Sequence, residues 1–333
     1  MSYALSFLDK SPIHGPEPAA AALQRSLSLA KRAEDLGYRR FWVAEHHNSP
    51  SLASSSPEVL ISFLLARTSR INIGSGGVML QHYSAYKVAE NFNLLAALAP
   101  GRVDLGVGKA PGGLPLSTRA LQQAYDPERK PSFSEQLTEL DGFLHHGDAG
   151  QSQDERPVAF PVPDQPPGRF VLGASAESAT LAARLGWGFV YAAHIHGDAS
   201  AIAEALAAYR NAGGTSALLA LSVITAETNA LAESIGGETR RFRVEVEGGQ
   251  AVNVGSEDQA REYVRQSGKT QYQIEERSPR LIRGTPSSVH AELQQLHRTY
   301  GVAEFIIDCP LSDGAQRLKT IELLAAGRAA IAA

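Results

Sequence analysis

Short apolar runs alternate along the chain with longer segments in which apolar residues recur every three or four positions. The short runs are typical of strands, and the longer spacing is that of one helix face. Strands are predicted at 3–11, 40–47, 70–80, 102–110, 169–174, 187–195, 216–227 and 304–310. Helices are predicted at 17–36, 56–69, 85–99, 132–147, 175–186, 198–213 and 285–301, and a last helix closes the chain.

This alternation favours one architecture. Strands separated by helices form parallel sheets, and eight such units favour an α/β (β/α)8 TIM barrel, a single domain over residues 1–333. The alternation of strand and helix patterns is less regular at 111–131, 148–168 and 228–284. We therefore expect extended loops after strands four and seven, with insert or lid regions in these ranges. The last of these contains a helix candidate and a possible short strand, RFRVEVE. A doubly wound sheet is the alternative, although it usually has fewer strands.

The barrel prediction also locates the site, because active sites of such barrels lie at the carboxyl ends of the strands. These ends combine small and ionisable residues in this chain. They are Asp9-Lys10-Ser11, Glu45-His46-His47, Gly76-Gly77-Val78, Gly108-Lys109-Ala110, Gly173-Ala174-Ser175, Ala193-His194-Ile195-His196, Ile224-Thr225 and Asp308-Cys309-Pro310.

The stretch GVGKAPGG at 106–113 invites comparison with phosphate-binding loops. A dinucleotide fingerprint starting at Gly106 fails at Pro111, and a P-loop ending at Lys109 fails at Val103. The chain therefore carries no standard nicotinamide or nucleoside triphosphate motif. Lys109 is left as either a phosphate ligand or a solvated surface lysine.

Two further strand ends have small or hydroxyl residues. GASAES at 173–178 runs from a strand into a helix whose first N–H groups can bind an anion, with Ser175 and Ser178 as added donors. Ordinary helix capping by Ser175 is the compatible alternative. Gly76 and Gly77 lie inside a strand pattern, where glycine marks a bulge or a close approach by a ligand.

The stretch FWVAEHHNSP at 41–50 places Glu45, His46 and His47 at the end of a buried strand. Alternation puts Glu45 and His47 on one face and His46 on the other, which argues against a shared metal shell. His194 and His196 could supply a second histidine pair, so a metal-dependent barrel hydrolase stays an alternative. Acid/base chemistry or substrate contact by one histidine fits the pattern better.

Composition narrows the class of protein. The net charge of −4 gives no electrostatic case for nucleic acid or an anionic membrane, and no apolar run approaches the length of a membrane-spanning helix. Cys309 is the single cysteine, so an internal disulfide and multi-cysteine zinc sites are excluded. With no signal-peptide pattern at the start, we expect a cytoplasmic protein.

Four sequence motifs of this chain occur together in one known family. AEHH, RTSRINIGSGGVML, KVAE and APGRVDLGVG, within residues 37–110, resemble the bacterial luciferase-like flavin-dependent monooxygenases, and residues 169–227 and 281–328 are similar to a lesser degree. The resemblance implies a TIM barrel that uses reduced FMN as co-substrate. It also implies reaction with O2 through a flavin C4a-hydroperoxide to oxygenate a small organic substrate. The reduced flavin would come from a separate NAD(P)H:flavin reductase, and a homodimer is common.

The resemblance also assigns residues. His46 matches the active-site histidine. Apart from the resemblance, we expect Glu45 beside it to orient the site, and a structural strand-end carboxylate is the alternative. Gly76-Gly77 matches the position of a cis peptide under the flavin ring. The positions that match the phosphate site are Lys109, Gly173, Ala174, Ser175 and Ser178, and Ala193 lies near flavin-ring contacts; no metal is implied.

Departures from the family pattern leave alternatives open. The family usually has arginine at Lys109, and relatives commonly read RAPGTD where this chain has KAPGGL, so an acidic residue is missing. One alternative is a deazaflavin (F420)-dependent oxidoreductase on the same barrel, and another is a non-catalytic flavin-binding protein. The substrate is open, since aldehydes, sulfonates, thioethers and polyketide-like compounds are all used by such barrels.

Overall fold

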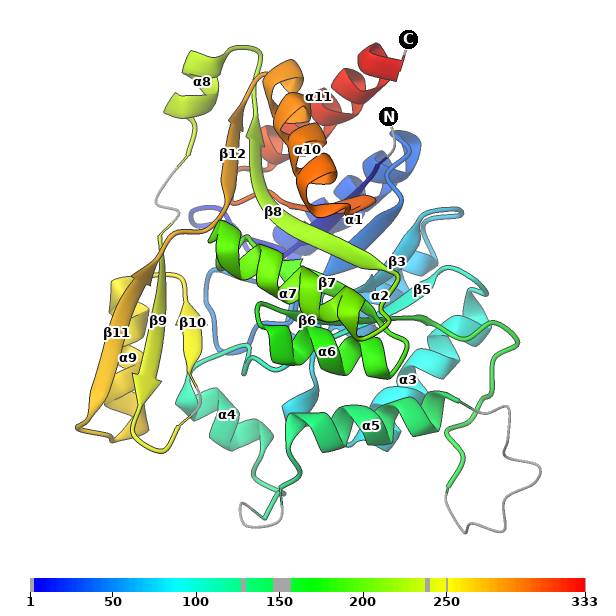
Figure 1. Cartoon of the computed structure of the whole chain (residues 1–333), viewed down its shortest axis with the longest axis vertical. Helices are drawn as coiled ribbons and strands as arrows, with labels where there is room; N and C mark the ends of the chain where they lie inside the picture. The colour runs from blue at the N-terminus through cyan, green and yellow to red at the C-terminus, as the bar shows by residue number, and fades with distance from the viewer. Residues whose placement is uncertain (1–2, 127–129, 146–156, 237–239, 250, 333) are drawn as a thin grey trace.

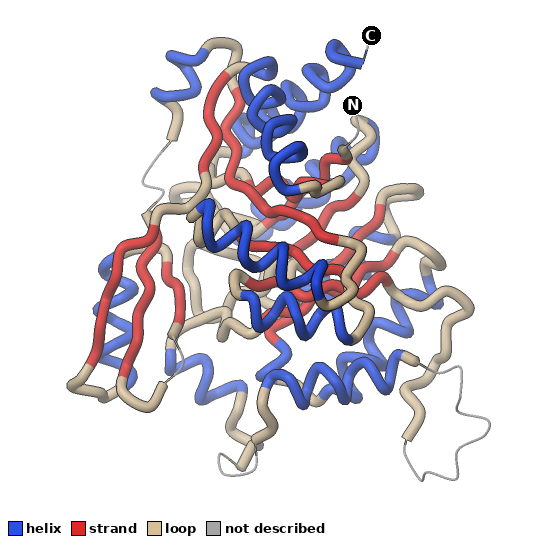
Figure 2. The backbone as a smooth tube through the Cα atoms, in the orientation of Figure 1, coloured by secondary structure: helices blue, strands red, loops and turns tan. Residues whose placement is uncertain are grey.

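The eight predicted strands close into a parallel barrel surrounded by helices (Figures 1 and 2). The computed structural model describes residues 3–126, 130–145, 157–236, 240–249 and 251–332. In order around the barrel the strands are β1 (Ala4–Asp9), β2 (Arg40–Val43), β3 (Asn72–Ser75), β5 (Val103–Gly108), β6 (Gly168–Gly173), β7 (Gly188–Ala192), β8 (Ala217–Thr225) and β13 (Glu304–Asp308), which pairs with β1. The predicted TIM barrel is confirmed.

Helices pack on the outside of the strands, and local signals explain where several of them begin and end. They are α1 (Ala19–Asp35), α2 (Pro57–Leu65), α3 (Ala85–Leu98), α5 (Phe133–Leu144), α6 (Ala176–Arg184), α7 (Ala199–Asn211), α10 (Pro286–Tyr300) and α11 (Gly314–Ala332). For α10, the Thr285 side chain accepts from the Ser288 N–H, and Gly301 ends the helix with φ +63°. Both residues do what the sequence predicts of them.

Some boundaries differ from the predictions. The helix predicted at 56–69 ends at Leu65, and the Thr68 hydroxyl then donates to the Leu64 carbonyl. The strand predicted at 70–80 is divided into β3 and β4 (Val78–Met79), followed by the 3-10 turn η1 (Leu80–His82). The peptide bond between Gly76 and Gly77, at this division, is cis. Two short helices, α4 (Pro115–Leu121) and α8 (Asn229–Ser234), lie within the predicted inserts.

Residues 241–277, within the long insert after β8, form a small α/β unit that we call the mini-domain. Its three-stranded antiparallel sheet is ordered β10 (Val252–Val254), β9 (Arg241–Val246), β11 (Tyr272–Arg277), and α9 (Glu257–Ser267) covers one face. Strand β9 is the predicted RFRVEVE segment. A further strand, β12 (Leu281–Gly284), returns the chain to the barrel by pairing with the end of β8.

Parts of the three predicted inserts, residues 127–129, 148–156, 237–239 and 250, lie outside the described residues. Where it is described, the region 228–284 is largely regular secondary structure rather than loop. Sequence reasoning missed β11 because most of its side chains are exposed, so no apolar alternation marks it.

Two apolar cores hold the barrel. The larger core lies between strands and helices, and the smaller one fills the barrel interior. Along every strand that contributes, the interior residues are even-numbered. The interior core consists of Leu8, Trp42, Ala44, Phe170, Val190, Leu218, Ala220 and Ile306. This strict alternation, with its period of two, predicts which side chains reach the barrel mouth.

Charged residues close the opposite, amino-terminal end of the barrel. The buried Arg40 guanidinium donates to both Asp104 carboxylate oxygens at 2.7 Å and to Glu304 at 2.8 Å, while Trp42 Nε1 donates to Asp104 at 3.0 Å. Because the partners satisfy one another, the charges are compatible with burial. These charged groups therefore block the amino-terminal end of the barrel interior.

Candidate active site

The barrel mouth has two walls that differ in chemistry. The wall on β3, β4 and β5 is made of glycine, and we call it the glycine wall (Gly76, Gly77, Gly106 and Gly108). The wall on β7, β8, β13 and β1 carries polar groups, and we call it the polar wall (His194, Ser222, Asp308 and Lys10). His46 follows β2, between the two walls in the order of strands.

Close packing explains most of the glycine wall. A Cβ on Gly76 would lie 2.7 Å from Leu8 Cδ1, and one on Gly77 would lie 2.7 Å from the Gly106 carbonyl oxygen. Gly108 differs, because a Cβ there would meet nothing nearer than the Met79 side chain at 3.9 Å. The wall is therefore rigid where its glycines pack on the protein and open where β5 ends.

The polar wall is built around an ion pair between partly buried Lys10 and buried Asp308. Lys10 Nζ lies 2.8 Å from Asp308 Oδ2, which also accepts from the Ser222 hydroxyl at 3.2 Å. Burial lowers the pKa of Lys10, although Asp308 opposes that effect. For Asp308, burial would raise the pKa, but Lys10 and then His194 outweigh it and hold the pKa well below its usual range. Asp308 is thus an anion at neutral pH.

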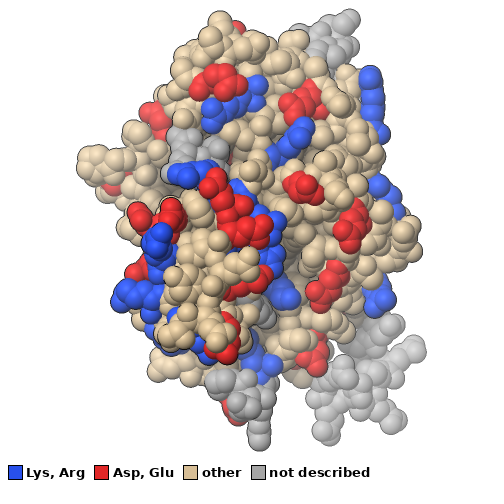
Figure 3. Space-filling view, turned by 60° about the vertical axis from the view of Figure 1, so that its left-hand side comes forward, with Lys and Arg blue, Asp and Glu red and all other residues tan. Residues whose placement is uncertain are grey.

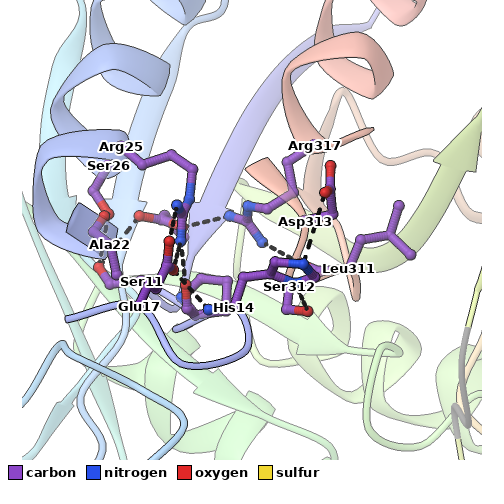
Figure 4. A network of polar contacts seen from close by, with 12 residues as sticks. Ser11, His14, Glu17, Ala22, Arg25, Ser26, Leu311, Ser312, Asp313 and Arg317 are labelled. Carbon is purple, nitrogen blue, oxygen red and sulfur yellow. Dashed lines mark hydrogen bonds and ion pairs between the residues drawn. The ribbon is translucent and has the colours of Figure 1, made fainter. Parts of the chain in front are cut away.

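The loops behind this ion pair are tied together (Figure 4). Arg317 on α11 donates to the carbonyls of Cys309 and Leu311 at 3.0 and 3.1 Å and also pairs with buried Asp9. On the other side, the Ser11 hydroxyl lies 2.8 Å from that of Ser26 on α1. Lys10 and Asp308, each next to one of these anchored residues, are held by the scaffold as a precise site requires.

Two histidines at the mouth are neutral and incompletely hydrogen-bonded. Burial is the main cause that lowers the pKa of His46 to about 3 and that of His194 to about 4; Lys10 adds to both effects. The Nδ1 atoms of both rings are buried and have no hydrogen-bond partner among the described residues. An unsatisfied buried polar atom costs free energy, so each is a candidate contact for a ligand.

Glu45 faces away from His46 and is fully occupied by protein groups. Its carboxylate accepts from the Met79 N–H at 3.0 Å, from the Tyr83 hydroxyl at 2.7 Å and from His47 Nε2 at 2.7 Å. These bonds join the end of β2 to β4 and η1. Glu45 is thus held by structural contacts, and its orienting role stays a prediction.

The predicted phosphate residues lie on neighbouring strand ends. The β5–β6 ladder pairs Gly108 with Leu172, so Lys109 and Gly173 follow side by side. Lys109 is exposed, and its ammonium group has no partner among the described residues. The Ser175 hydroxyl accepts from the Ser178 N–H at 3.2 Å, which confirms capping of α6 and leaves the anion role as a prediction.

Ala174 is half-buried in the same strand-to-helix turn, but Ala193 is placed elsewhere. The Ala193 side chain is completely buried in the outer core, and its carbonyl accepts from the Arg280 N–H at 2.7 Å. The structure therefore brings His194, rather than the Ala193 side chain, to the mouth.

Comparison with known proteins defines the family. Residues 2–303 match the family model described as luciferase-like monooxygenase. The chain belongs to this family. It is 44% identical over 328 residues to the N-acetyl-S-alkylcysteine monooxygenase of Bacillus subtilis, covering 96% of each chain, and 32% identical to a luciferase-like monooxygenase of Escherichia coli, covering 96% of this chain and 95% of that one.

Solved structures agree with the family. The luciferase-like chain superposes on apo-MsnO8 with a TM-score of 0.77 and 31% identity, covering 98% of this chain and 97% of that one. The oxygenating constituent of 3,6-diketocamphane monooxygenase from Pseudomonas putida, solved in complex with FMN, shares the fold at 15% identity, with a TM-score of 0.68 and coverage of 97% and 96%. The protein is accordingly an oxidoreductase of the monooxygenase class.

Within the described ranges, no three His, Cys, Asp or Glu side chains are grouped to hold a metal ion, and no helix there is both long and apolar enough to cross a membrane. Sequence reasoning placed Lys10, His194 and Asp308 at strand ends but assigned no role in flavin or substrate binding to them. The alternation of interior and exterior side chains along each strand is the signal that identifies them. All three residues are even-numbered, like the residues of the interior core.

Proposed function

We propose that this luciferase-like chain is an FMN-dependent monooxygenase that oxygenates a small organic substrate with O2. The observation that carries the proposal is the division of the barrel mouth into a glycine wall and a polar wall, with neutral His46 after the strand that joins them. A flat ring system needs a wall without side chains, and a second reactant needs polar groups opposite. The barrel mouth of this chain has a wall of each kind.

The residues present fit reduced FMN. Gly108 leaves open space at the end of β5, and Gly76-Gly77 and Gly173-Ala174 present little more than backbone beside it. Lys109 and the first N–H groups of α6, with Ser175 and Ser178, would hold the phosphate. Bound there, reduced FMN would supply the electrons that activate O2.

His46 would contribute a hydrogen bond in its neutral form. With a pKa of about 3, the imidazole carries no charge near pH 7, and its free Nδ1 can accept or donate one hydrogen bond, depending on the tautomer. A neutral ring at the mouth can hydrogen-bond a reacting oxygen without adding a positive charge. The Glu45 contacts fix the backbone that carries it.

The proposal includes two partners. Since the chain lacks a nicotinamide fingerprint, a separate NAD(P)H:flavin reductase would supply reduced FMN. The substrate class follows the 44% identical relative, which is named for N-acetyl-S-alkylcysteines. We infer a thioether of this kind, which gains one oxygen atom at sulfur.

A homodimer is proposed from an exposed apolar surface on α2 and α3, which lie side by side. Val59 and Leu98 are 67% and 69% exposed, and Phe63 and Leu94 extend the surface along the same two helices. Exposed apolar patches of this kind mark interaction sites. Phe63→Glu should convert a dimer into a monomer in light scattering, whereas Leu116→Glu, at an exposed leucine on α4, should not. A monomeric wild-type protein would refute the dimer.

The function is tested by cofactor titration and turnover. Oxidised FMN, anaerobically reduced FMN and reduced F420 are titrated, and oxygenation of N-acetyl-S-methylcysteine is then followed with NADH and an added flavin reductase. Binding of reduced FMN and formation of the sulfoxide support the proposal. If neither FMN form binds below millimolar concentration, the proposal is contradicted, and a preference for F420 would replace the oxygenase with a hydride-transfer enzyme.

A further inference from the structure

The mini-domain is anchored directly beside the polar wall. The Gly197 N–H donates to the Ser278 carbonyl at 3.1 Å, and the Arg280 N–H donates to the Ala193 carbonyl. These bonds join the segment after β11 to the chain after β7. The space between them is tight, because a Cβ on Gly197 would lie 2.3 Å from the Arg280 nitrogen. The near end of the mini-domain sheet therefore lies next to His194.

Arg241 is the first residue of β9 and pairs with Arg277 of β11, so it lies at this anchored end of the sheet. Alternation places Phe242 and Val244 against α9 in the mini-domain core. Arg241, Arg243 and Glu245 therefore share the opposite, uncovered face. A shallow cavity of about 200 Å³ lies on that face, lined by Arg243, Glu245, Gln273, Glu275 and Arg277.

Among the described residues, the charges on this face and on the polar wall are paired except at Arg241. Arg243 pairs with Glu245, Arg277 with Glu275 at 2.8 Å, and Lys10 with Asp308. Arg241 has no carboxylate partner among the described residues, and its guanidinium donates to the Arg240 carbonyl at 3.0 Å. Lys and Arg side chains are interspersed with Asp and Glu side chains over the face of the molecule seen in Figure 3.

The charge of Arg241 reaches the barrel mouth. Burial has the largest effect on the pKa of each titratable group there, and nearer charges come next. Arg241 adds a smaller contribution, which lowers the pKa of Lys10, His46, His194 and Asp308. With both histidines neutral and Asp308 neutralised by Lys10, Arg241 is left, among the described residues of this region, as a positive charge without a carboxylate partner. A partly desolvated cation of this kind is stabilised by a bound anion.

We propose that Arg241, together with the free Nδ1 of His194, forms a subsite for the carboxylate of an acidic substrate at the barrel mouth. The subsite rests on the proposed function, because it assigns the polar wall to the oxygen-accepting substrate. The anchored end of the sheet brings Arg241 to the wall, and the unpartnered histidine nitrogen supplies a second hydrogen bond. The mini-domain thereby selects anionic over neutral thioethers.

The test compares N-acetyl-S-methylcysteine with its methyl ester, which removes the charge and keeps the thioether. Binding to the FMN-free protein is measured by calorimetry, and kcat/KM is measured with reduced FMN. Wild-type protein should favour the acid roughly tenfold or more, which is what a charge-assisted hydrogen bond contributes. Arg241→Gln should lose that preference by weakening the acid alone, and Arg241→Lys should keep part of it.

Arg240→Gln is the matched control, since it removes the same charge one residue away on an exposed side chain. It should leave the preference unchanged. The subsite is overturned if wild-type protein does not distinguish acid from ester, or if Arg241→Gln retains the discrimination. Because binding is measured without flavin, a protein that selects the acid but forms no sulfoxide would refute the proposed function and leave the subsite standing.

Discussion

The glycine wall and the polar wall of the barrel mouth are ordered by different forces. The glycine wall is set by backbone contacts, since Gly77 has no room for a side chain against Gly106. The polar wall is set by charge, with Asp308 held between Lys10 and Ser222. Steric constraint suits a cofactor of fixed shape, whereas charge pairing suits substrates that differ in shape but share one polar group.

The largest effect is expected from breaking the ion pair. Asp308→Ala leaves the partly buried Lys10 without a counter-charge and should lower the free energy of unfolding by about 3–5 kcal/mol, measured by urea denaturation at pH 7. The control is the double variant Lys10→Met/Asp308→Leu, which removes both charges. It should be clearly more stable than Asp308→Ala, and equal losses would contradict the assignment of this pair as the element that organises the polar wall.

The glycine wall is tested by one added methyl group at two positions. In Gly77→Ala the new Cβ meets β5 backbone at 2.7 Å, so unfolding free energy should fall by about 2–3 kcal/mol. Gly108→Ala adds the same atom where nothing lies within 3.9 Å, and its stability should stay within about 0.5 kcal/mol of wild type. Equal stability of the two variants would remove the steric argument.

The pH dependence of the free energy of unfolding tests the polar wall through His194. Folding lowers the pKa of buried His194 from 6.5 to about 4, so the unfolded chain takes up its proton more readily. The contribution to stability is complete above pH 6.5 and declines as the pH falls toward 4. When the pH is lowered from 7 to 5, the free energy of unfolding should fall by about 2 kcal/mol less in His194→Gln than in wild type. A loss of stability in His194→Gln that is parallel to that of wild type would contradict the prediction.

The smallest effect concerns the phosphate. Lys109→Arg supplies a planar guanidinium that can hold two phosphate oxygens, so binding of reduced FMN should tighten about fivefold, near 1 kcal/mol. Riboflavin, which lacks the phosphate, is the matched ligand and should bind both proteins alike. A change for riboflavin as large as that for FMN would place Lys109 away from the phosphate.

The barrel followed from the sequence because its strands and helices have strong periodicity, and the capping residues Ser175 and Thr285 mark helix starts locally. The resemblance supplied the Gly76-Gly77 position, where the structure has a cis bond. His46 and Glu45 were located by the strand-end rule. These signals are all local, which is why a single sequence carries them.

The polar wall and the mini-domain were harder to predict. Lys10 and Asp308 are close because β1 and β13 are neighbours in a closed barrel, although 298 residues separate them in the chain. The bonds that anchor the mini-domain sheet beside β7 bring the first residue of β9, Arg241, toward the polar wall. No periodicity within the sequence encodes such long-range contacts, and the exposed strand β11 lacks an apolar pattern.

The central claim is that the two walls bind different reactants. The most direct measurement is a pair of anaerobic equilibrium titrations, with reduced FMN and with N-acetyl-S-methylcysteine, on Gly108→Val and Arg241→Gln. We predict that Gly108→Val loses affinity for reduced FMN and still binds the thioether in the absence of flavin, whereas Arg241→Gln binds reduced FMN normally and loses the thioether. If each variant weakens both ligands equally, or if Gly108→Val binds reduced FMN like wild type, the division of the barrel mouth is contradicted.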